Sequence, residues 1–271
     1  DLSGRKLGSQ GAKIIGRNVK WINLKKLDLS RNIISEEGAI AIANNKTWKE
    51  LQELILNSNK ISDNGIIAIS ENTCWENLQK LQLESNCIRD FGAKTLGTNL
   101  MWKKLEVLDL SQNDIGEGAA KAIGCNANWV FLKKLDLSSN KIRDEGAKGI
   151  AKNKTWIHLE ELNLADNKIG RRGAAAIGGN TTWKNLKILS LENNAFKDTG
   201  AIVIVKNKAW GNLEELYLYW NSLSKEFTDK LEKKYNLEQY EVVNLQDRRR
   251  CPSVFREFKG RQCETIWKKF E

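Results

Sequence analysis

Apolar and polar residues along this chain alternate in a pattern that returns every 27 residues. Each unit contains a segment of the form Leu-x-x-Leu-x-Leu-x-x-Asn, as in residues 24–32. Such a short alternation predicts a β-strand, with Leu27 and Leu29 on its buried face and Asp28 on the opposite face. A glycine, often followed by alanine, and then an isoleucine come next at helical spacing. Each unit is therefore predicted to hold one strand and one helix.

A tryptophan occupies the same position in successive units. The members of this column are Trp21, Trp48, Trp75, Trp102, Trp129, Trp156, Trp183 and Trp210. An interval that never changes is the signature of a repeat array, in which each unit packs only on its neighbours. The column could be an exposed aromatic ladder that binds a ligand. We favour a buried stack, because large aromatic side chains dominate the energetics of cores.

Asparagine also recurs at two fixed positions of the unit. The column from Asn32 to Asn221 follows the strand, where a buried amide can bond the free backbone groups of a turn and form a ladder. The column from Asn45 to Asn207 closes each helix, and these residues are expected to adopt the left-handed conformation that ends helices.

The start of each predicted helix carries an acid and a glycine. The acids, such as Asp63 and Asp144, suit the N-cap position of the helix that they begin. The glycine column, which includes Gly38 and Gly173, is expected to let the helix approach the strand layer closely.

Together, these motifs resemble the leucine-rich repeat of the ribonuclease-inhibitor type, as in NOD-like receptors and the Ran GTPase-activating protein. The resemblance covers residues 1 to about 245, because Leu-x-x-Leu-x-Leu-x-x-Asn and Gly-Ala-x-x-Ile recur together there. It implies an α/β solenoid that is curved, with a parallel sheet on the concave face and helices on the convex face, and that mostly binds proteins. The sequence is already in the repeat register at Leu2, so we expect the chain to begin inside a repeat.

The C-terminal end departs from the repeat. Residues 237–245 fit a ninth strand, but Arg248 replaces its asparagine. Apolar residues follow at helical spacing, at Cys263, Ile266, Trp267 and Phe270. We expect a solenoid over residues 1–246 and a helical cap over residues 247–271, because the open end of a solenoid needs a cover. The alternative is that this apolar stripe docks on a partner.

The predicted concave face is acidic although the whole chain carries a net charge of +10. The positive residues on its eight regular strands are Lys26, Arg31, Lys80 and Lys134, and the negative ones are Asp28, Glu53, Glu84, Asp109, Asp136, Glu161, Asp166, Glu192 and Glu215. Their balance is negative, so the excess of lysine and arginine lies on the helices, links and C-terminal segment. Opposite charges on neighbouring strands are about 4.8 Å apart and can pair.

Aromatic residues gather on the last regular strand. The predicted partner-binding residues are Tyr217, Tyr219, Trp220, Glu192, Glu215, Ile188 and Asp166. Tyrosine and tryptophan are enriched at binding hot spots, and Trp220 lies outside the 27-residue column. The competing interpretation is that the C-terminal cap folds over these aromatic residues.

Nothing in the sequence indicates catalysis, a metal site or a cofactor. His158 is the single histidine and has no cysteine at ligand spacing, and no phosphate-binding loop is present. Five unevenly spaced cysteines form a poor disulfide framework and favour a cytoplasmic protein over a secreted one, although Cys251 and Cys263 are close enough in sequence to bridge. Three glycosylation sequons at Asn45, Asn153 and Asn180 would matter in a secreted protein, but the asparagine column explains them.

The sequence therefore predicts a non-enzymatic scaffold that binds a protein partner through its concave sheet. Two alternatives remain. The basic block that includes Arg248–Arg250 could bind nucleic acid or an anionic surface. By fold analogy the chain could regulate a small GTPase, although no catalytic residue of that family maps onto it.

Overall fold

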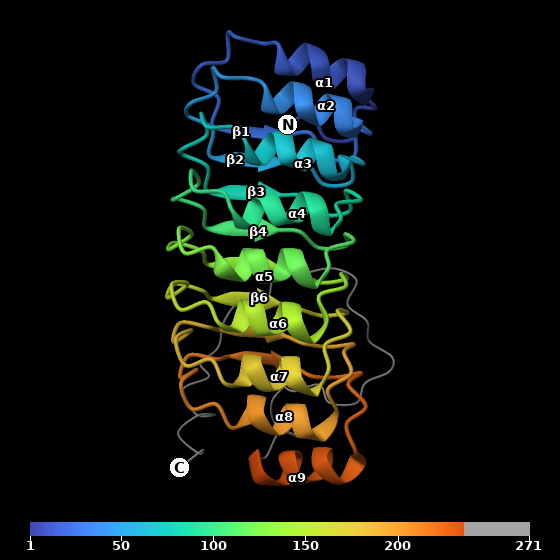
Figure 1. Ribbon diagram of the computed structural model, residues 1–271, viewed down its shortest axis with the longest axis vertical. Coiled ribbons are helices and arrows are strands. Elements are labelled where there is room, and N and C mark those ends of the chain that lie inside the picture. Colours follow the sequence, from blue (N-terminus) through green and yellow to red (C-terminus); the bar gives the residue numbers. More distant parts are fainter. Residues whose placement is uncertain (236–271) are drawn as a thin grey trace.

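The computed structural model describes residues 1–235, in which strands and helices alternate along the chain (Figure 1). The strands are β1 (Lys26–Asp28), β2 (Glu53–Ile55), β3 (Lys80–Gln82), β4 (Val107–Asp109), β5 (Lys134–Asp136), β6 (Glu161–Asn163), β7 (Ile188–Ser190) and β8 (Glu215–Tyr217). The helices are α1 (Gly8–Gly16), α2 (Ser35–Ala43), α3 (Ser62–Ser70), α4 (Asp90–Gly97), α5 (Glu117–Cys125), α6 (Arg143–Ala151), α7 (Arg171–Gly178), α8 (Lys197–Val205) and α9 (Lys225–Tyr235).

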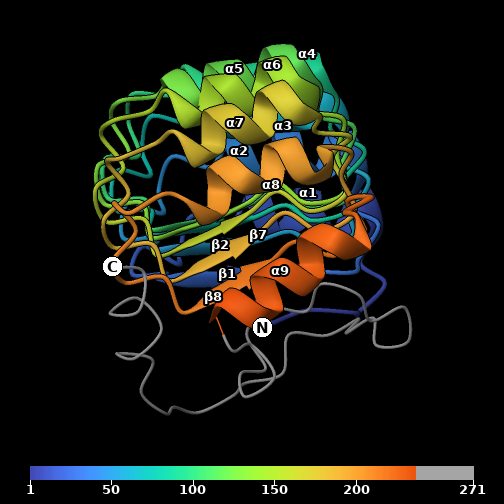
Figure 2. The ribbon, with the colours of Figure 1, turned by 90° about the horizontal axis from the view of Figure 1, so that it is seen from below.

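The eight strands form one parallel sheet in chain order, β1 to β8. Equivalent residues pair, so that Leu27 lies beside Leu54 and Leu54 beside Leu81. Viewed along the stack, the helices form an arc whose middle members α4–α6 lie farthest from the sheet side, whereas α1 and α9 lie nearer to it (Figure 2). The predicted α/β solenoid with a concave sheet and convex helices is therefore confirmed.

The core lies between the sheet and the helices. Leu54 and Leu56 of one repeat are fully buried. Glu53, which precedes them and lies on the opposite face of the strand, is partly exposed. Seven tryptophans of the column, from Trp48 to Trp210, have no exposed surface. The predicted buried stack is thus confirmed for these seven. Trp21 differs and is 39% exposed, because no tryptophan of an earlier link in the described chain packs on it.

The indole N–H groups of the buried column make no hydrogen bond to the described residues. This holds for Nε1 of all seven fully buried members, Trp48, Trp75, Trp102, Trp129, Trp156, Trp183 and Trp210. A buried donor without an acceptor costs about 1–3 kcal/mol. The stack therefore contributes through apolar burial, and its polar atom opposes that contribution.

The first asparagine column forms the predicted ladder. The Asn59 side chain donates from Nδ2 to the carbonyls of Leu29 and Leu56, both at 2.9 Å. Its Oδ1 accepts the backbone N–H of Asn32 in the preceding repeat at 3.0 Å. The same pattern recurs between neighbouring repeats and ties each turn to the one before it, for example between Asn86 and Asn59.

The second asparagine column is a ladder too, so the predicted left-handed conformation is wrong. Asn45 and its equivalents are absent from the positive-φ residues of the described chain, whereas Arg31 and Ile33 take φ values of 58° and 53°. The Asn45 side chain instead donates to the carbonyls of Gly16 and Asn18, both at 2.9 Å, and so satisfies the end of the preceding helix. This burial and bonding explain the sequon asparagines as structural residues.

The acids at the helix starts do not cap their own helices, contrary to the prediction. No side-chain cap bond forms at the N-terminus of α6, for example. Asp144 of α6 instead accepts N–H bonds from Gly170 and Gly173 at the start of α7. Asp90 of α4 likewise accepts the N–H of Ala119 in α5 at 2.8 Å. Each such acid therefore links its helix to the next one.

The glycine column allows close packing between neighbouring helices. The prediction that it brings each helix close to the strand layer is wrong. A Cβ atom at Gly38 would lie 2.7 Å from Cβ of Ala12 in α1 and 3.1 Å from Cβ of Ile34. At Gly200 the equivalent neighbours are Ala174 Cβ at 2.9 Å and Phe196 Cβ at 2.6 Å. A side chain at Gly38 or Gly200 would therefore force these neighbours to shift, whereas the repeat of α5 accommodates Ala119 in the same column.

Several predictions concern the C-terminal segment. The ninth strand over residues 237–245, the cap over residues 247–271, the Cys251–Cys263 bridge and the basic block lie outside the described residues. Within residues 1–235, none of the helices has the length and apolar character required to cross a membrane.

Candidate partner-binding face

The concave face is built by the strand residues that alternate with the buried leucines. Two of the predicted charge pairs form between neighbouring strands. Nζ of Lys26 lies 2.9 Å from Oε2 of Glu53, and Nζ of Lys134 lies 2.6 Å from Oε2 of Glu161. Apart from these pairs, the positive residues of this face are Arg31 and Lys80. The negative ones are Asp28, Glu84, Asp109, Asp136, Asp166, Glu192 and Glu215. The face thus keeps its acidic excess.

Acids are crowded in the middle of this face. Asp109 of β4 pairs in register with Asp136 of β5. The pKa of Asp136 is raised to about 6, first by burial and then by the charge of Asp109, while hydrogen bonds from Ser138 and Asn163 oppose the shift. Burial and the same Asp109 charge raise the pKa of Glu84. A positive charge placed between these carboxylates would relieve their repulsion.

Glu192 is the most perturbed acid near the C-terminal end of the face. Its pKa is raised to about 7, mainly by burial and also by the charge of Asp136, while hydrogen bonds from its own backbone and from Tyr219 oppose the shift. Its Oε2 is buried and has no hydrogen-bond partner among the described residues. An incomplete hydrogen-bond set on a buried carboxylate is unusual in a folded protein.

The aromatic residues of the last repeat form one cluster beside Glu192. The rings of Tyr217 and Tyr219 meet edge to face with centroids 6.4 Å apart, and those of Tyr219 and Trp220 do so at 5.1 Å. The Tyr217 hydroxyl donates to Oε2 of Glu215 at 2.5 Å. Burial and this bond raise the pKa of Tyr217. Trp220 is 41% exposed, whereas Tyr219 is buried and supports its neighbours.

The predicted site residues divide into a cluster and one outlier. Ile188 pairs in register with Glu215, so it borders the aromatic cluster. Asp166 is exposed and lies farther along the face, where Nδ2 of Asn193 donates to its Oδ1 at 3.2 Å. Asn193 in turn donates its backbone N–H to the carbonyl of Tyr219 at 3.0 Å. Asp166 is therefore joined to the cluster through one intervening residue.

A second surface was missed by the sequence reasoning. It lies on the flank where the chain passes from each tryptophan into the next strand, and we call it the strand-entry flank. Its exposed apolar members are Ile22 in the first repeat and, in the middle of the chain, Val130, Phe131 and Ile157. The rings of Phe131 and His158 stack with centroids 6.0 Å apart and an angle of 15°. In the sequence, each of these residues lies in a variable segment between a tryptophan and the next strand. Those in the middle of the chain become neighbours only because the repeats stack.

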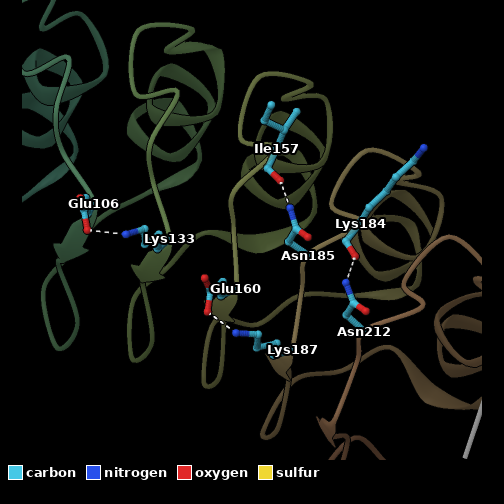
Figure 3. A network of polar contacts seen from close by, with 8 residues as sticks. All are labelled: Glu106, Lys133, Ile157, Glu160, Lys184, Asn185, Lys187 and Asn212. Atoms are coloured by element: carbon cyan, nitrogen blue, oxygen red, sulfur yellow. Dashed lines mark hydrogen bonds and ion pairs between the residues drawn. The ribbon is translucent and has the colours of Figure 1, made fainter. Parts of the chain in front are cut away.

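Charged residues of alternating sign run along the same flank (Figure 3). Glu106 and Lys133 pair at 2.8 Å, and Glu160 and Lys187 pair at 2.6 Å. Hydrogen bonds from Asn185 to the Ile157 carbonyl and from Asn212 to the Lys184 carbonyl also join successive repeats, at 2.8 and 3.0 Å. These contacts order the flank.

No cluster of three or more possible metal ligands occurs in the described part of the chain. The concave face offers charge, aromatic surface and hydrogen-bonding groups, which suit the recognition of another macromolecule.

Comparison with known families matches the family described as "Leucine Rich repeat" at seven segments of the chain. The matched residues are 22–43, 50–70, 76–97, 103–124, 130–151, 157–178 and 184–205. Comparison with curated proteins found no match.

Proposed function

Because the chain belongs to the leucine-rich repeat family, whose repeats generally mediate protein–protein interaction, we propose that it is a non-enzymatic scaffold that binds a protein through its concave sheet. The contact centres on Tyr217, Trp220, Glu192 and Glu215, with Tyr219 as their support. Ile188 and Asp166 extend it along the face. The ribonuclease-inhibitor sub-type remains a prediction from the motif.

The observation that carries the proposal is the aromatic cluster next to the incompletely bonded acid Glu192. Trp220 is partly exposed and held edge to face by Tyr219. Rigid aromatic side chains of this kind give large contact area at a small entropic cost. Glu192 keeps a buried oxygen without a partner.

The charge of the face favours a partner that presents basic side chains there. Two concave acids are already neutralised by lysines, and those that remain outnumber Arg31 and Lys80. An arginine or lysine near Trp220 could contact both the indole face and a carboxylate. Electrostatic complementarity of this kind raises association rates and fixes orientation more than it raises affinity.

A photoreactive amino acid at position 220 tests the proposal. In lysate, it is expected to cross-link a discrete protein, and the cross-link should disappear when Tyr217 is changed to alanine without a change in thermal melting. The matched control carries the photoreactive residue at Phe91, which is 71% exposed at the start of α4 on the helical side. Equal cross-linking from both positions would contradict the proposal.

The two alternatives predicted from the sequence have their own signatures. Cross-linking to nucleic acid, with affinity that falls steeply with salt, would favour the basic C-terminal block as the binding site. A change in the turnover of a small GTPase upon addition of this chain would favour regulation of such an enzyme.

A further inference from the structure

The strand-entry flank carries an apolar patch at the centre of the described solenoid. Val130 and Phe131 come from one repeat, and Ile157 and His158 come from the next. Their exposed fractions are 38% for Val130, 48% for Phe131 and 51% for Ile157. The repeats on either side have polar residues at these positions, namely Lys103, Lys104, Lys184 and Asn185. The patch is therefore confined to two repeats and has a polar rim.

Charges of alternating sign run along this flank, so this row can pair with an identical row that runs in the opposite direction. In chain order the column reads Glu106, Lys133, Glu160, Lys187 and Glu214, of which Figure 3 draws the first four. About an axis between Lys133 and Glu160, an identical row running in the opposite direction presents Lys133 to Glu160 and Lys187 to Glu106, and Glu214 comes opposite Gln79. The apolar patch has its midpoint between the same two repeats.

We propose that two copies of this chain associate through the strand-entry flank, in antiparallel orientation, with Phe131 and Ile157 at the centre of the interface. A two-fold axis crosses the flank between the repeats of Lys133 and Glu160. Interfaces with this symmetry use the same patch on both subunits and must be self-complementary. The flank meets that requirement in both its apolar and its charged parts.

The symmetry determines which residues meet. Lys133 of one copy faces Glu160 of the other, and Glu106 faces Lys187. At the centre, Val130 faces Ile157, and the stacked ring pair of Phe131 and His158 faces the same pair in reverse.

The neighbouring column of strand residues follows the same rule. The axis sets Lys134 opposite Glu161 and Val107 opposite Ile188. One like-charged contact also results, because Lys103 comes to lie opposite Lys184. Both are long side chains at the polar rim and can extend away from each other.

The ion pairs within each chain do not remove this complementarity. Glu106 and Lys133 are 37% and 48% exposed as side chains, and Glu160 and Lys187 are 38% and 44% exposed. Each charge therefore keeps a solvent-facing side that a second copy can approach. The apolar centre supplies the driving force, and the charges select the antiparallel orientation.

The arrangement leaves Tyr217, Tyr219 and Trp220 of the concave faces free. The two-fold axis lies in the plane of the contact and runs from the helical side to the sheet side, so both concave faces open in the same direction. A dimer of this kind would present two partner sites to one surface. It does not depend on the proposed function, because the flank and the proposed partner contact share only Ile188, at the border of the aromatic cluster.

Sedimentation velocity of the full chain at several concentrations tests the proposal. The wild-type chain is expected to show a reversible monomer–dimer equilibrium. Phe131→Asp and Ile157→Asp should each weaken it at least tenfold without lowering the melting temperature, whereas Phe91→Asp should leave it unchanged. A chain that stays monomeric at all concentrations, or a dimer that is insensitive to both flank substitutions, would overturn the proposal.

A charge swap separates contacts between copies from contacts within a chain. Lys133→Glu sets like charges against each other in the dimer and should raise its dissociation constant about tenfold, which is about 1.4 kcal/mol. Adding Glu160→Lys restores opposite charges across the axis while it abolishes both ion pairs within the chain. The double variant should dimerise within threefold of the wild type. A double variant that dimerises more weakly than Lys133→Glu would overturn the antiparallel arrangement.

Discussion

The carboxylate of Asp144, a residue of α6, accepts the backbone N–H of Gly173 in α7 at 2.8 Å. The same Oδ1 accepts the N–H of Gly170 at 2.7 Å. One side chain thus caps the helix of the following repeat, where the first N–H groups have no partner within the helix. Contacts between neighbouring repeats stabilise a solenoid, and this bond is one of those contacts.

Replacing Asp144 by alanine is expected to lower the free energy of unfolding by about 1–2 kcal/mol, the usual effect of losing a helix cap. Urea denaturation followed by circular dichroism measures the change. Glu145 is the matched control, because it is the next acid in α6 and its side chain is exposed and pairs with Lys148 of the same helix. Glu145→Ala should leave stability nearly unchanged, and equal losses in the two variants would argue against capping between repeats.

Replacing Asn59 by alanine should be more costly. The change leaves buried carbonyls at Leu29 and Leu56 and the N–H of Asn32 without their partner. Each lost bond to a buried group costs about 1–3 kcal/mol, so a total loss of at least about 3 kcal/mol is expected in denaturant titrations. Asn64 is a suitable control because its amide bonds only to Glu36 at the surface. A mild effect at Asn59 would show that the turns do not need the ladder.

The tryptophan column allows a test of its unbonded indole groups. Trp129→Ala should lower the free energy of unfolding by about 3–5 kcal/mol, because it leaves a large cavity between repeats. Trp129→Phe should cost less than half as much, since phenylalanine fills part of the space and removes a buried N–H that lacks an acceptor. Equilibrium unfolding of both variants compares the two losses. If phenylalanine is as harmful as alanine, the indole N–H has a bonding role.

Glu192 makes stability depend on pH. Its pKa rises from 4.5 in the unfolded chain to about 7 in the folded chain, so the folded state binds more protons between these values. Stability should therefore fall as pH rises from about 4.5 to about 7. Glu192→Gln should stabilise the protein at pH 8 by on the order of 2 kcal/mol and should have little effect at pH 4.

Thermal unfolding across this pH range, with Asp166→Asn as an exposed control, provides the measurement. A stabilisation by Glu192→Gln that is the same at pH 4 and pH 8 would exclude ionisation of Glu192 as the cause.

Sequence periodicity was sufficient for the architecture. The alternation at Leu27 and Leu29 predicted the strands and their buried face, and the constant spacing predicted the burial of Trp129, because stacked units place equivalent residues in register. The pairing of Lys26 with Glu53 also followed from that register.

Other features depend on contacts that cross from one repeat to the next, and periodicity alone does not reveal them. Asp144 could cap either its own helix or the next, and both choices have the same sequence pattern. Asn45 looked like a left-handed helix terminus, but its side chain reaches the carbonyl of Gly16 instead. Phe131 and Ile157 lie in variable links, so their patch became visible only when the links were stacked side by side.

The most direct test of partner binding through the concave face is a titration of the cross-linked partner against two single variants by calorimetry. Trp220→Ala should weaken binding at least tenfold while melting stays unchanged, because it removes the exposed aromatic at the centre of the contact. Phe91→Ala, on the helical side, should bind like the wild type. Unchanged affinity for Trp220→Ala together with lost affinity for Phe91→Ala would contradict the account and place the partner on the convex face.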